Sequence, residues 1–488
     1  IKPTQAGTTL GVTGGSTTAI LILNGADYVT LDGSTGNTVN ACCSTPASRD
    51  LTISNANSGT GSAVIWLQSN GTDGATHNTV KNCNLAGNSN TTTLFGLGSG
   101  SSSIGTSSLG SGNSFNSFIN NSISKTQYGI YTQGAGASAK NTGNTISQNL
   151  INAASPDNVA KGGIWTGYED NLTISCNVID GISQSSSPDV FGITCGFGIS
   201  VAATSYSGNE VTNAVITKNV IGGVINSGTF SAYGIGICSA SSGTNLVANN
   251  MIYGVKANAT SGDIAAGIVL GGGTGSTTRV YYNSVSMQGT ITGSTAASQT
   301  TACLAITNST EPVVDIRDNI FSNTQLGNTS ATLRFTAIAL AYSTYTNLLS
   351  NYNDLYAAGA GPGTYAIGIT GGVVSGTSRT TLANWQSTTG KDGASVNILP
   401  VFTALTDLHL VPGSNYGLND LGTPLSVTDD IDCASRSVTA PDMGADEFDP
   451  PVCTAATGGT AAGDATFCAS GTPAITASGY SVGLGSAY

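Results

Sequence analysis

The sequence predicts an all-β protein, a solenoid of about ten stacked coils, from two observations. First, a phrase of the form apolar–x–x–Asn–x–apolar occurs seven times between residues 118 and 321, with Asn-to-Asn steps of 28, 28, 42, 31, 33 and 36 residues. Second, short alternating runs such as GIYTQG, GIWTGY and GIGICS fall between the copies. A fixed phrase with variable spacers is typical of coils that stack while their loops differ in length.

Each asparagine of the phrase is predicted to mark a corner. Side chains five residues apart on a straight strand point to opposite faces, yet both flanking positions are large and apolar in every copy. Both should therefore point inward, which requires a bend, and an Asn in the left-handed region supplies one. The alternative is seven unrelated strands of a sandwich. The predicted corners, whose side chains could also form a ladder, are Asn121, Asn149, Asn177, Asn219, Asn250, Asn283 and Asn319.

The solenoid is expected to extend in both directions. Weaker coils are indicated upstream, with Cys83 in the Asn position, and downstream around Asn353, one residue out of register. We assign residues 1–449 to the solenoid, including an irregular cap from about residue 375 that holds a short helix around Trp385 and an extended strand pair. Residues 450–488 read as the truncated start of another module, and Ile1 lies in strand-like sequence, so we expect the natural chain to be longer.

The composition restricts the function classes. Charged residues make up 8% of the chain and the formal charge is −12, which disfavours binding to nucleic acid or anionic lipid. No apolar stretch approaches the ~20 residues of a membrane span. Sequence rich in Gly, Ser and Thr with an acidic balance suits an extracellular surface.

The ten cysteines include no Cys-x-x-Cys pair, which disfavours zinc. Cys453 and Cys468 are the best disulfide candidates, because their Gly-rich segment has too few apolar residues to fold unaided. Adjacent Cys42 and Cys43 cannot easily bond each other, so at least one needs a distant partner.

The closing segment carries a family resemblance. DLHL (Asp407–Leu410) is followed by Asp430, Ile431, Asp432, Arg436, Asp442, Gly444, Ala445 and Glu447, with Cys433 in place of the usual Gly. Together with YVTLDG at Tyr28 and the repeated phrase, this pattern resembles large secreted surface proteins of Bacteroidota. The resemblance implies a right-handed parallel β-helix with a pectate-lyase-like superhelix, type IX secretion, and Ig-like or PKD-like repeats after residue 452. Such scaffolds carry lyases, hydrolases, adhesins and inert spacers, so the resemblance does not fix an activity.

Two candidate sites stand out. Seven carboxylates lie within residues 429–449, and Asp430, Asp432, Asp442 and Glu447 could hold a structural calcium ion. The alternative is an acidic cap in which Arg436 pairs with one of these groups. The second candidate is an aromatic surface for sugar rings, Trp165, Tyr168 and Tyr131, with Trp165 on the outer face because it follows an inward Ile; the alternative is packing.

We therefore expect a non-catalytic structural or adhesive module that contacts a glycan or cell-surface ligand, without a cofactor other than the possible calcium. The second hypothesis is a lyase or glycoside hydrolase of acidic polysaccharide; acids and bases share no fixed offset in successive coils, so no catalytic residue is predicted. A third hypothesis, an ice- or mineral-binding face of Thr rows, requires a regular lattice that spacers of 28 to 42 residues do not indicate.

Overall fold

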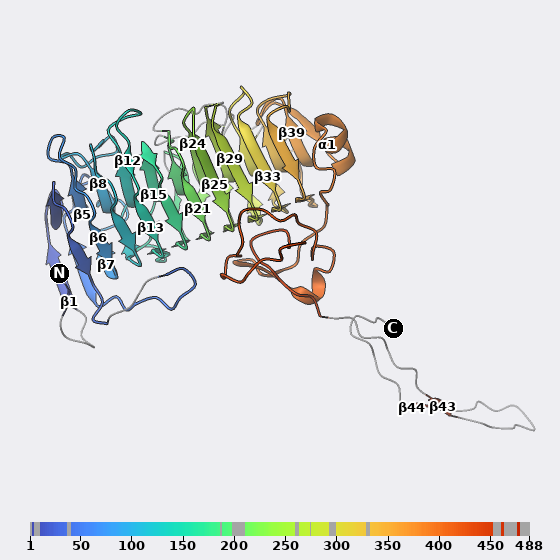
Figure 1. The fold of residues 1–488 in the computed structure, drawn as a ribbon, viewed down its shortest axis with the longest axis horizontal. Coiled ribbons are helices and arrows are strands. Elements are labelled where there is room, and N and C mark those ends of the chain that lie inside the picture. The colour runs from blue at the N-terminus through green and yellow to red at the C-terminus, as the bar shows by residue number, and fades with distance from the viewer. Residues whose placement is uncertain are drawn as a thin grey trace, which may run out of the picture.

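The computed structural model describes residues 2–3, 10–36, 41–185, 188–197, 210–258, 263–273, 275–291, 299–327 and 332–451, and the backbone of two short strands beyond them. This part of the chain is nearly all β, with three long parallel sheets and a single α-helix. The strands lie side by side along the long axis of the molecule (Figure 1).

Sheets A, B and C contain 11, 12 and 10 strands. Sheet A consists of β1 (Leu10–Gly14), β4 (Leu51–Asn55), β7 (Cys83–Ala86), β10 (Ser122–Ser124), β14 (Leu150–Ile151), β18 (Val178–Ile179), β22 (Val220–Ile221), β26 (Met251–Tyr253), β30 (Ser284–Met287), β34 (Ile320–Asn323) and β38 (Asp354–Ala357). Sheet B consists of β2 (Leu21–Asn24), β5 (Ala63–Gln68), β8 (Phe95–Gly100), β11 (Tyr128–Gln133), β15 (Gly162–Gly167), β20 (Val190–Cys195), β24 (Ala232–Ser239), β28 (Ile264–Gly272), β32 (Thr300–Ile306), β36 (Arg334–Leu340), β39 (Thr364–Thr370) and the antiparallel β40 (Thr377–Arg379). Sheet C consists of β3 (Thr30–Asp32), β6 (Thr79–Lys81), β9 (Ser117–Ile119), β13 (Thr145–Ser147), β17 (Thr173–Ser175), β21 (Val215–Thr217), β25 (Thr244–Ala248), β29 (Thr277–Tyr281), β33 (Val313–Arg317) and β37 (Leu348–Asn351).

The chain visits these sheets in turn, so that β1, β2 and β3 belong to sheets A, B and C, and β4 pairs in parallel with β1. Such repeated passes through large parallel sheets fit a parallel β-helix. Shorter parallel sheets form in the loops, from β12 (Asn141–Thr142) with β16 (Glu169–Asp170), β19 (Ser183–Gln184) with β23 (Ile225–Asn226) and β27 (Lys256–Ala257), and β31 (Thr290–Ile291) with β35 (Leu326–Gly327).

The core is filled by aligned aliphatic side chains. Both apolar positions of the repeated phrase are at most 1% exposed in all seven copies. In sheet C, for example, Phe118, Ile146 and Ile174 occupy one register position, so each side chain packs on the equivalent one of the next strand. Burial of each such side chain is worth about 1.5–3 kcal/mol.

The corner asparagines lie in the bend between a strand of sheet C and the next strand of sheet A, and all seven side chains are fully buried. The backbone N–H of each donates to Oδ1 of the next, at 2.9–3.1 Å, from Cys83 through to Asn353. Asn353 is therefore in register, contrary to expectation. The left-handed conformation was also assigned to the wrong residue: the residue before each Asn has the positive φ, as at Lys218 (58°) before Asn219.

Two irregular segments, the β3–β4 loop and the C-terminal cap, dock along this line of corner residues. The β3–β4 loop (residues 33–50) reaches Asn120, whose carbonyl oxygen accepts from Arg49 Nε at 2.8 Å. The cap then folds back under the later coils (Figure 1), where Lys218 Nζ lies 2.7 Å from Asp429. Loop and cap are joined by a Cys43–Cys433 disulfide. The cap contains α1 (Leu382–Thr389), the antiparallel pair β41 (Phe402–Ala404) and β42 (Asp407–Leu410), and a 3₁₀ turn at Pro412–Ser414.

Beyond the cap, β43 (Thr460–Ala462) and β44 (Thr476–Ser478) form an antiparallel pair. The predicted Cys453–Cys468 disulfide lies outside the described residues. Among the described residues, no helix combines the length and the apolar character that a membrane crossing requires.

Candidate functional site

Three aromatic rings stack on the surface of the N-terminal coils. Tyr28, His77 and Phe115 precede β3, β6 and β9, and their ring centroids are separated by 4.7 Å and 4.9 Å with nearly parallel planes. Tyr28 is 75% and Phe115 49% exposed. We call this group the aromatic stack.

A second asparagine ladder holds the bend that carries the stack. The backbone N–H of Val29 donates to Asn78 Oδ1, and that of Asn78 donates to Asn116 Oδ1, both at 2.9 Å. The three ring-bearing residues have φ between 54° and 57°, which bulky residues seldom adopt. The next residue in the column is Gly143, where a Cβ atom would meet the Phe115 ring at 2.7 Å, so the stack ends there.

Polar groups lie beside the rings. Asp27 accepts hydrogen bonds from the hydroxyl and the backbone N–H of Thr76, at 2.6 and 2.8 Å, and these bonds lower the pKa of this exposed carboxylate. Thr76 Oγ1 also lies 3.2 Å from His77 Nδ1. The stack thus combines apolar ring surface with a fixed, ionised hydrogen-bond acceptor.

Hydroxyl groups form a row on the adjoining outer face of sheet C. Thr30, Thr79, Ser117, Thr145 and Thr173 occupy successive register positions. This short row forms despite spacers of variable length, because the additional loop residues lie between strands and do not alter their register. The row includes Ser and stops at Val215, so it is shorter and less regular than a Thr lattice.

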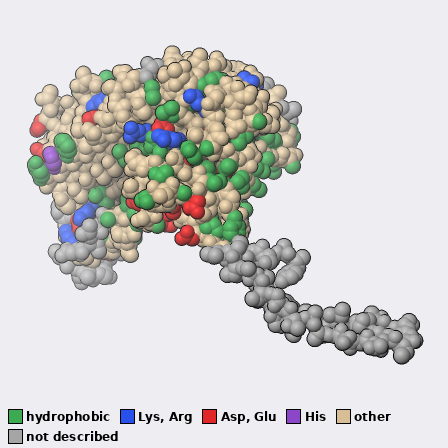
Figure 2. All heavy atoms as spheres, turned by 45° about the vertical axis from the view of Figure 1, so that its right-hand side comes forward, with side chains coloured by type: hydrophobic (Ala, Val, Ile, Leu, Met, Phe, Trp, Pro, Cys, Tyr) green, Lys and Arg blue, Asp and Glu red, His purple; other side chains and the backbone are tan. Residues whose placement is uncertain are grey.

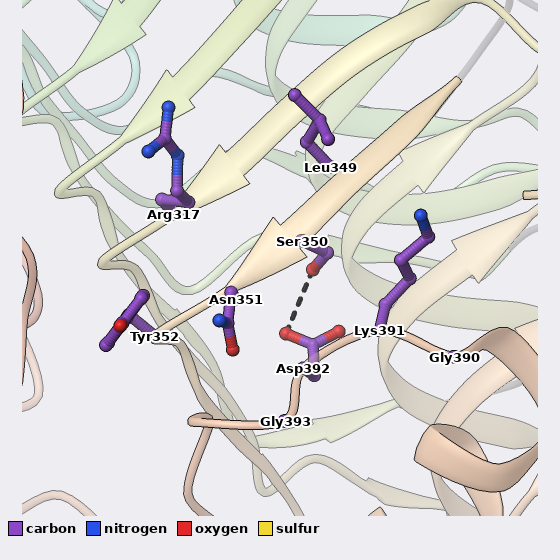
Figure 3. A pocket seen from close by; sticks show the side chains of 9 residues that line it. All are labelled: Arg317, Leu349, Ser350, Asn351, Tyr352, Gly390, Lys391, Asp392 and Gly393. Carbon is purple, nitrogen blue, oxygen red and sulfur yellow. Dashed lines mark hydrogen bonds between the residues drawn. The ribbon is translucent and has the colours of Figure 1, made fainter. Parts of the chain in front are cut away.

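A basic hollow of about 500 Å³ lies at the other end of sheet C (Figure 3). Arg317 is held by Asp315 through bonds of 2.6 and 2.7 Å, which raise the pKa of its guanidinium. Lys391 also lines the hollow, and Leu349 is 53% exposed. Asp392 is buried and accepts from Ser350 Oγ at 2.9 Å and Trp385 Nε1 at 2.7 Å. The hollow therefore presents Arg317 and Lys391 to an anionic group, while its carboxylate, Asp392, already accepts two hydrogen bonds.

The predicted sugar-binding aromatics are not available at the surface. Trp165 is paired in register with Tyr131 and lies on the outer side of sheet B, but it is 2% exposed and Tyr131 is fully buried. Trp165 Nε1 donates to Phe197 O and Tyr131 OH donates to Ser108 O, so loops cover both rings. Tyr168 is partly exposed at the bend after β15. The alternative of packing is therefore correct for Trp165 and Tyr131.

Three of the predicted calcium ligands, Asp430, Asp442 and Glu447, serve as acceptors for the cap backbone, whereas the exposed Asp432 contacts His409. Asp430 accepts from the N–H groups of Asp432, Ala434 and Glu447, and Asp442 from those of Asp420 and Phe448. Burial raises the pKa of Asp442 to about 7.

Glu447 accepts from Ser437 N, Asp442 N and Arg436, whose guanidinium also packs 4.1 Å from the Tyr282 ring centroid. The acidic cap visible in Figure 2 is thus held together by these bonds rather than by four carboxylates converging on one point.

Both adjacent cysteines have distant partners. Cys42 bonds Cys176, and Cys43 bonds Cys433, with Cα–Cα distances of 5.8 and 6.1 Å. The first bond ties the β3–β4 loop to the third predicted corner, at Asn177, and the second ties the loop to the cap.

Sequence reasoning missed the aromatic stack, although a signal existed. His77, Phe115 and Gly143 each lie six residues before a ladder position, at Cys83, Asn121 and Asn149. Aligning the copies on that position would have placed them in one column.

A comparison with known protein families finds no family model that matches the chain, and a comparison with curated proteins finds no match.

Proposed function

We propose that the protein is a non-catalytic, extracellular structural and adhesive module of a large cell-surface protein, which binds glycans. In this proposal it is a right-handed parallel β-helix of about ten coils, supported by long sheets of ten to twelve strands. The rigid stack holds its surface loops and corners at fixed positions, where recognition residues are most useful.

The aromatic stack is the observation that carries the binding function. His77 covers one face of the Tyr28 ring, while 75% of Tyr28 remains exposed. A sugar ring can pack on the free face, and Asp27 and the hydroxyl row can accept or donate the hydrogen bonds that its hydroxyls require. The basic hollow adds a place for a carboxylate or sulfate of an acidic glycan.

The disulfides support an extracellular location, because such bonds persist in oxidising compartments. The resemblance to Bacteroidota surface proteins supports export by the type IX machinery and attachment to further domains of the same chain. Neither the extracellular location nor the export route depends on which glycan is bound.

The competing hypothesis is cleavage of acidic polysaccharide. Asp392 in the basic hollow is bonded to Ser350 and Trp385, and Asp315 beside the hollow is bonded to Arg317. Carboxylates held in this way stabilise the fold and its cations, which favours binding over acid–base chemistry.

Affinity electrophoresis on a panel of neutral and acidic polysaccharides tests the proposal. Covering about 50 Å² of ring is worth ~1.3 kcal/mol, so Tyr28→Ala should weaken binding roughly tenfold. Tyr416→Ala, which removes another exposed Tyr, is the matched control and should bind as the unaltered protein does. Equal binding by both variants would contradict the role of the stack, and release of oligosaccharide products would contradict the non-catalytic assignment.

A further inference from the structure

Three segments of the cap bring an imidazole and two carboxylates together. His409 lies on β42, Asp432 in the turn before Cys433, and Asp446 near the end of the cap. One ligand atom from each residue lies within 4.8 Å of the other two, and His409 Nε2 is 2.9 Å from Asp432 Oδ2. This set shares only Asp432 with the calcium ligands expected from the sequence.

A fourth residue fixes the orientation of the imidazole. His409 Nδ1 lies 2.5 Å from Asp407 Oδ1, so Nδ1–H donates to that carboxylate and Nε2 is directed toward Asp432. A histidine that binds a metal usually donates its other ring N–H to a carboxylate, which sets the tautomer and raises the basicity of the nitrogen that binds.

The local charge also favours a cation. Asp407, Asp432 and Asp446 place three carboxylates around the His409 imidazole. Negative charge therefore remains there even when the ring carries a proton. The neighbouring Asp430 is already satisfied by backbone N–H groups.

We propose that His409, Asp432 and Asp446 form a binding site for a divalent transition metal of the zinc type. One imidazole nitrogen and two carboxylate oxygens suit Zn²⁺, with water in the remaining position. Ligands at about 2.0–2.2 Å from a tetrahedral zinc ion lie ~3.4 Å from one another. The three atoms, which are now between 2.9 Å and 4.8 Å apart, therefore require only small shifts. The Asp432 side chain is 64% exposed and can make this movement. The bound ion would clip β42, the Asp432 turn and the end of the cap together.

Isothermal titration of the untagged protein with ZnCl₂ tests the site, and Co²⁺ absorption identifies its ligands. We expect one ion per chain, and at least tenfold weaker binding by Asp432→Asn. Among the described residues, the Asp432 side chain bonds only to His409. His409→Ala should abolish binding. Asp449→Asn alters another exposed carboxylate of the cap and should leave zinc binding unchanged.

The competing explanation is a histidine held between carboxylates by hydrogen bonds alone. No zinc uptake by the unaltered protein, or uptake that Asp432→Asn and His409→Ala both retain, would overturn the proposal. Because Asp432 is exposed, its substitution remains informative if His409→Ala fails to fold. Glycan binding at the aromatic stack is independent of either outcome.

Discussion

Truncation of Asn219 to Ala should reveal how much the asparagine ladder stabilises the stack. The Asn219 side chain is fully buried. Its Oδ1 accepts from the backbone N–H and the side-chain amide of Asn177, at 3.1 and 2.9 Å. Its Nδ2 donates to Ile174 O, Thr217 O and Asn250 Oδ1 at 2.9–3.1 Å.

The magnitude follows from the groups that lose a partner. Asn219→Ala leaves two buried donors of Asn177 without their acceptor, whereas Asn250 Oδ1 still accepts from the Asn219 backbone at 3.0 Å. Each buried donor left unsatisfied costs about 1–3 kcal/mol. We therefore expect a loss of about 4 kcal/mol, which exceeds the effect of most single substitutions.

Urea denaturation followed by circular dichroism measures the loss, and hydrogen exchange locates it. In a stack where each coil contacts only its neighbours, faster exchange should be confined to β18, β22 and β26. Asn258→Ala is the control, because among the described residues its side chain makes one exposed bond, of 3.3 Å to Ser227 O. Loss of that bond should cost less than about 0.5 kcal/mol. Equal and small losses for both variants would refute the ladder as a source of stability.

Two further predictions concern pH and the disulfide between loop and cap. Burial raises the pKa of Glu169 from 4.5 to about 7, so its contribution to folding is complete below pH 4.5 and is lost as the pH rises through 7, at most about 3 kcal/mol. Glu169→Gln should therefore gain stability relative to the unaltered protein over this pH range in urea denaturation; a constant difference would contradict the buried-acid assignment. The double substitution of Cys43 and Cys433 to Ser should release the cap and the β3–β4 loop together, seen as faster limited proteolysis of both, at a cost of about 2–5 kcal/mol. Unchanged cleavage of the cap would show that its other contacts suffice.

The sequence predicted the corners well, because large apolar residues on both sides of the Asn admit few other arrangements. It did not predict which residue takes the positive φ. Asn219 uses its backbone N–H and its side chain in the ladder at once, and Lys218 takes the left-handed conformation (φ 58°). A preference of Asn for the left-handed region was a weaker argument than the hydrogen bonds that the Asn must make.

The binding residues were harder to predict because burial depends on loops. Period-two alternation correctly put Trp165 opposite inward Ile164, but could not show that the segment at Phe197 covers it. Conversely, Tyr28 and Phe115 each precede a strand that has no unusual sequence feature. They form a shared aromatic surface only because the stacking of the coils aligns them with His77. The metal-site residues come from three cap segments whose contact no local pattern encodes.

The residue before each ladder Asn differs from coil to coil, whereas the Asn itself is constant, because the two positions have different surroundings. The Asn faces the same ladder in every coil, but the residue before it meets a different partner. Asn120, Gln148 and Cys176 meet Arg49, Ala41 and Cys42 of the β3–β4 loop, whereas Lys218, Asn249, Tyr282 and Asp318 meet the cap at Asp429, Arg436 and Thr423.

The change of partner falls between Cys176 and Lys218, which is where the Cys43–Cys433 bond joins loop to cap and where Lys218 Nζ lies 3.1 Å from Cys433 Sγ. Loop and cap therefore act as one strap along a single corner of the stack. The strap leaves the aromatic stack and the hydroxyl row of sheet C uncovered, whereas further along sheet C Leu425 and Val427 of the cap pack against Leu246. The segments that close the fold and the surface proposed to bind glycan therefore do not compete for the same part of the coils.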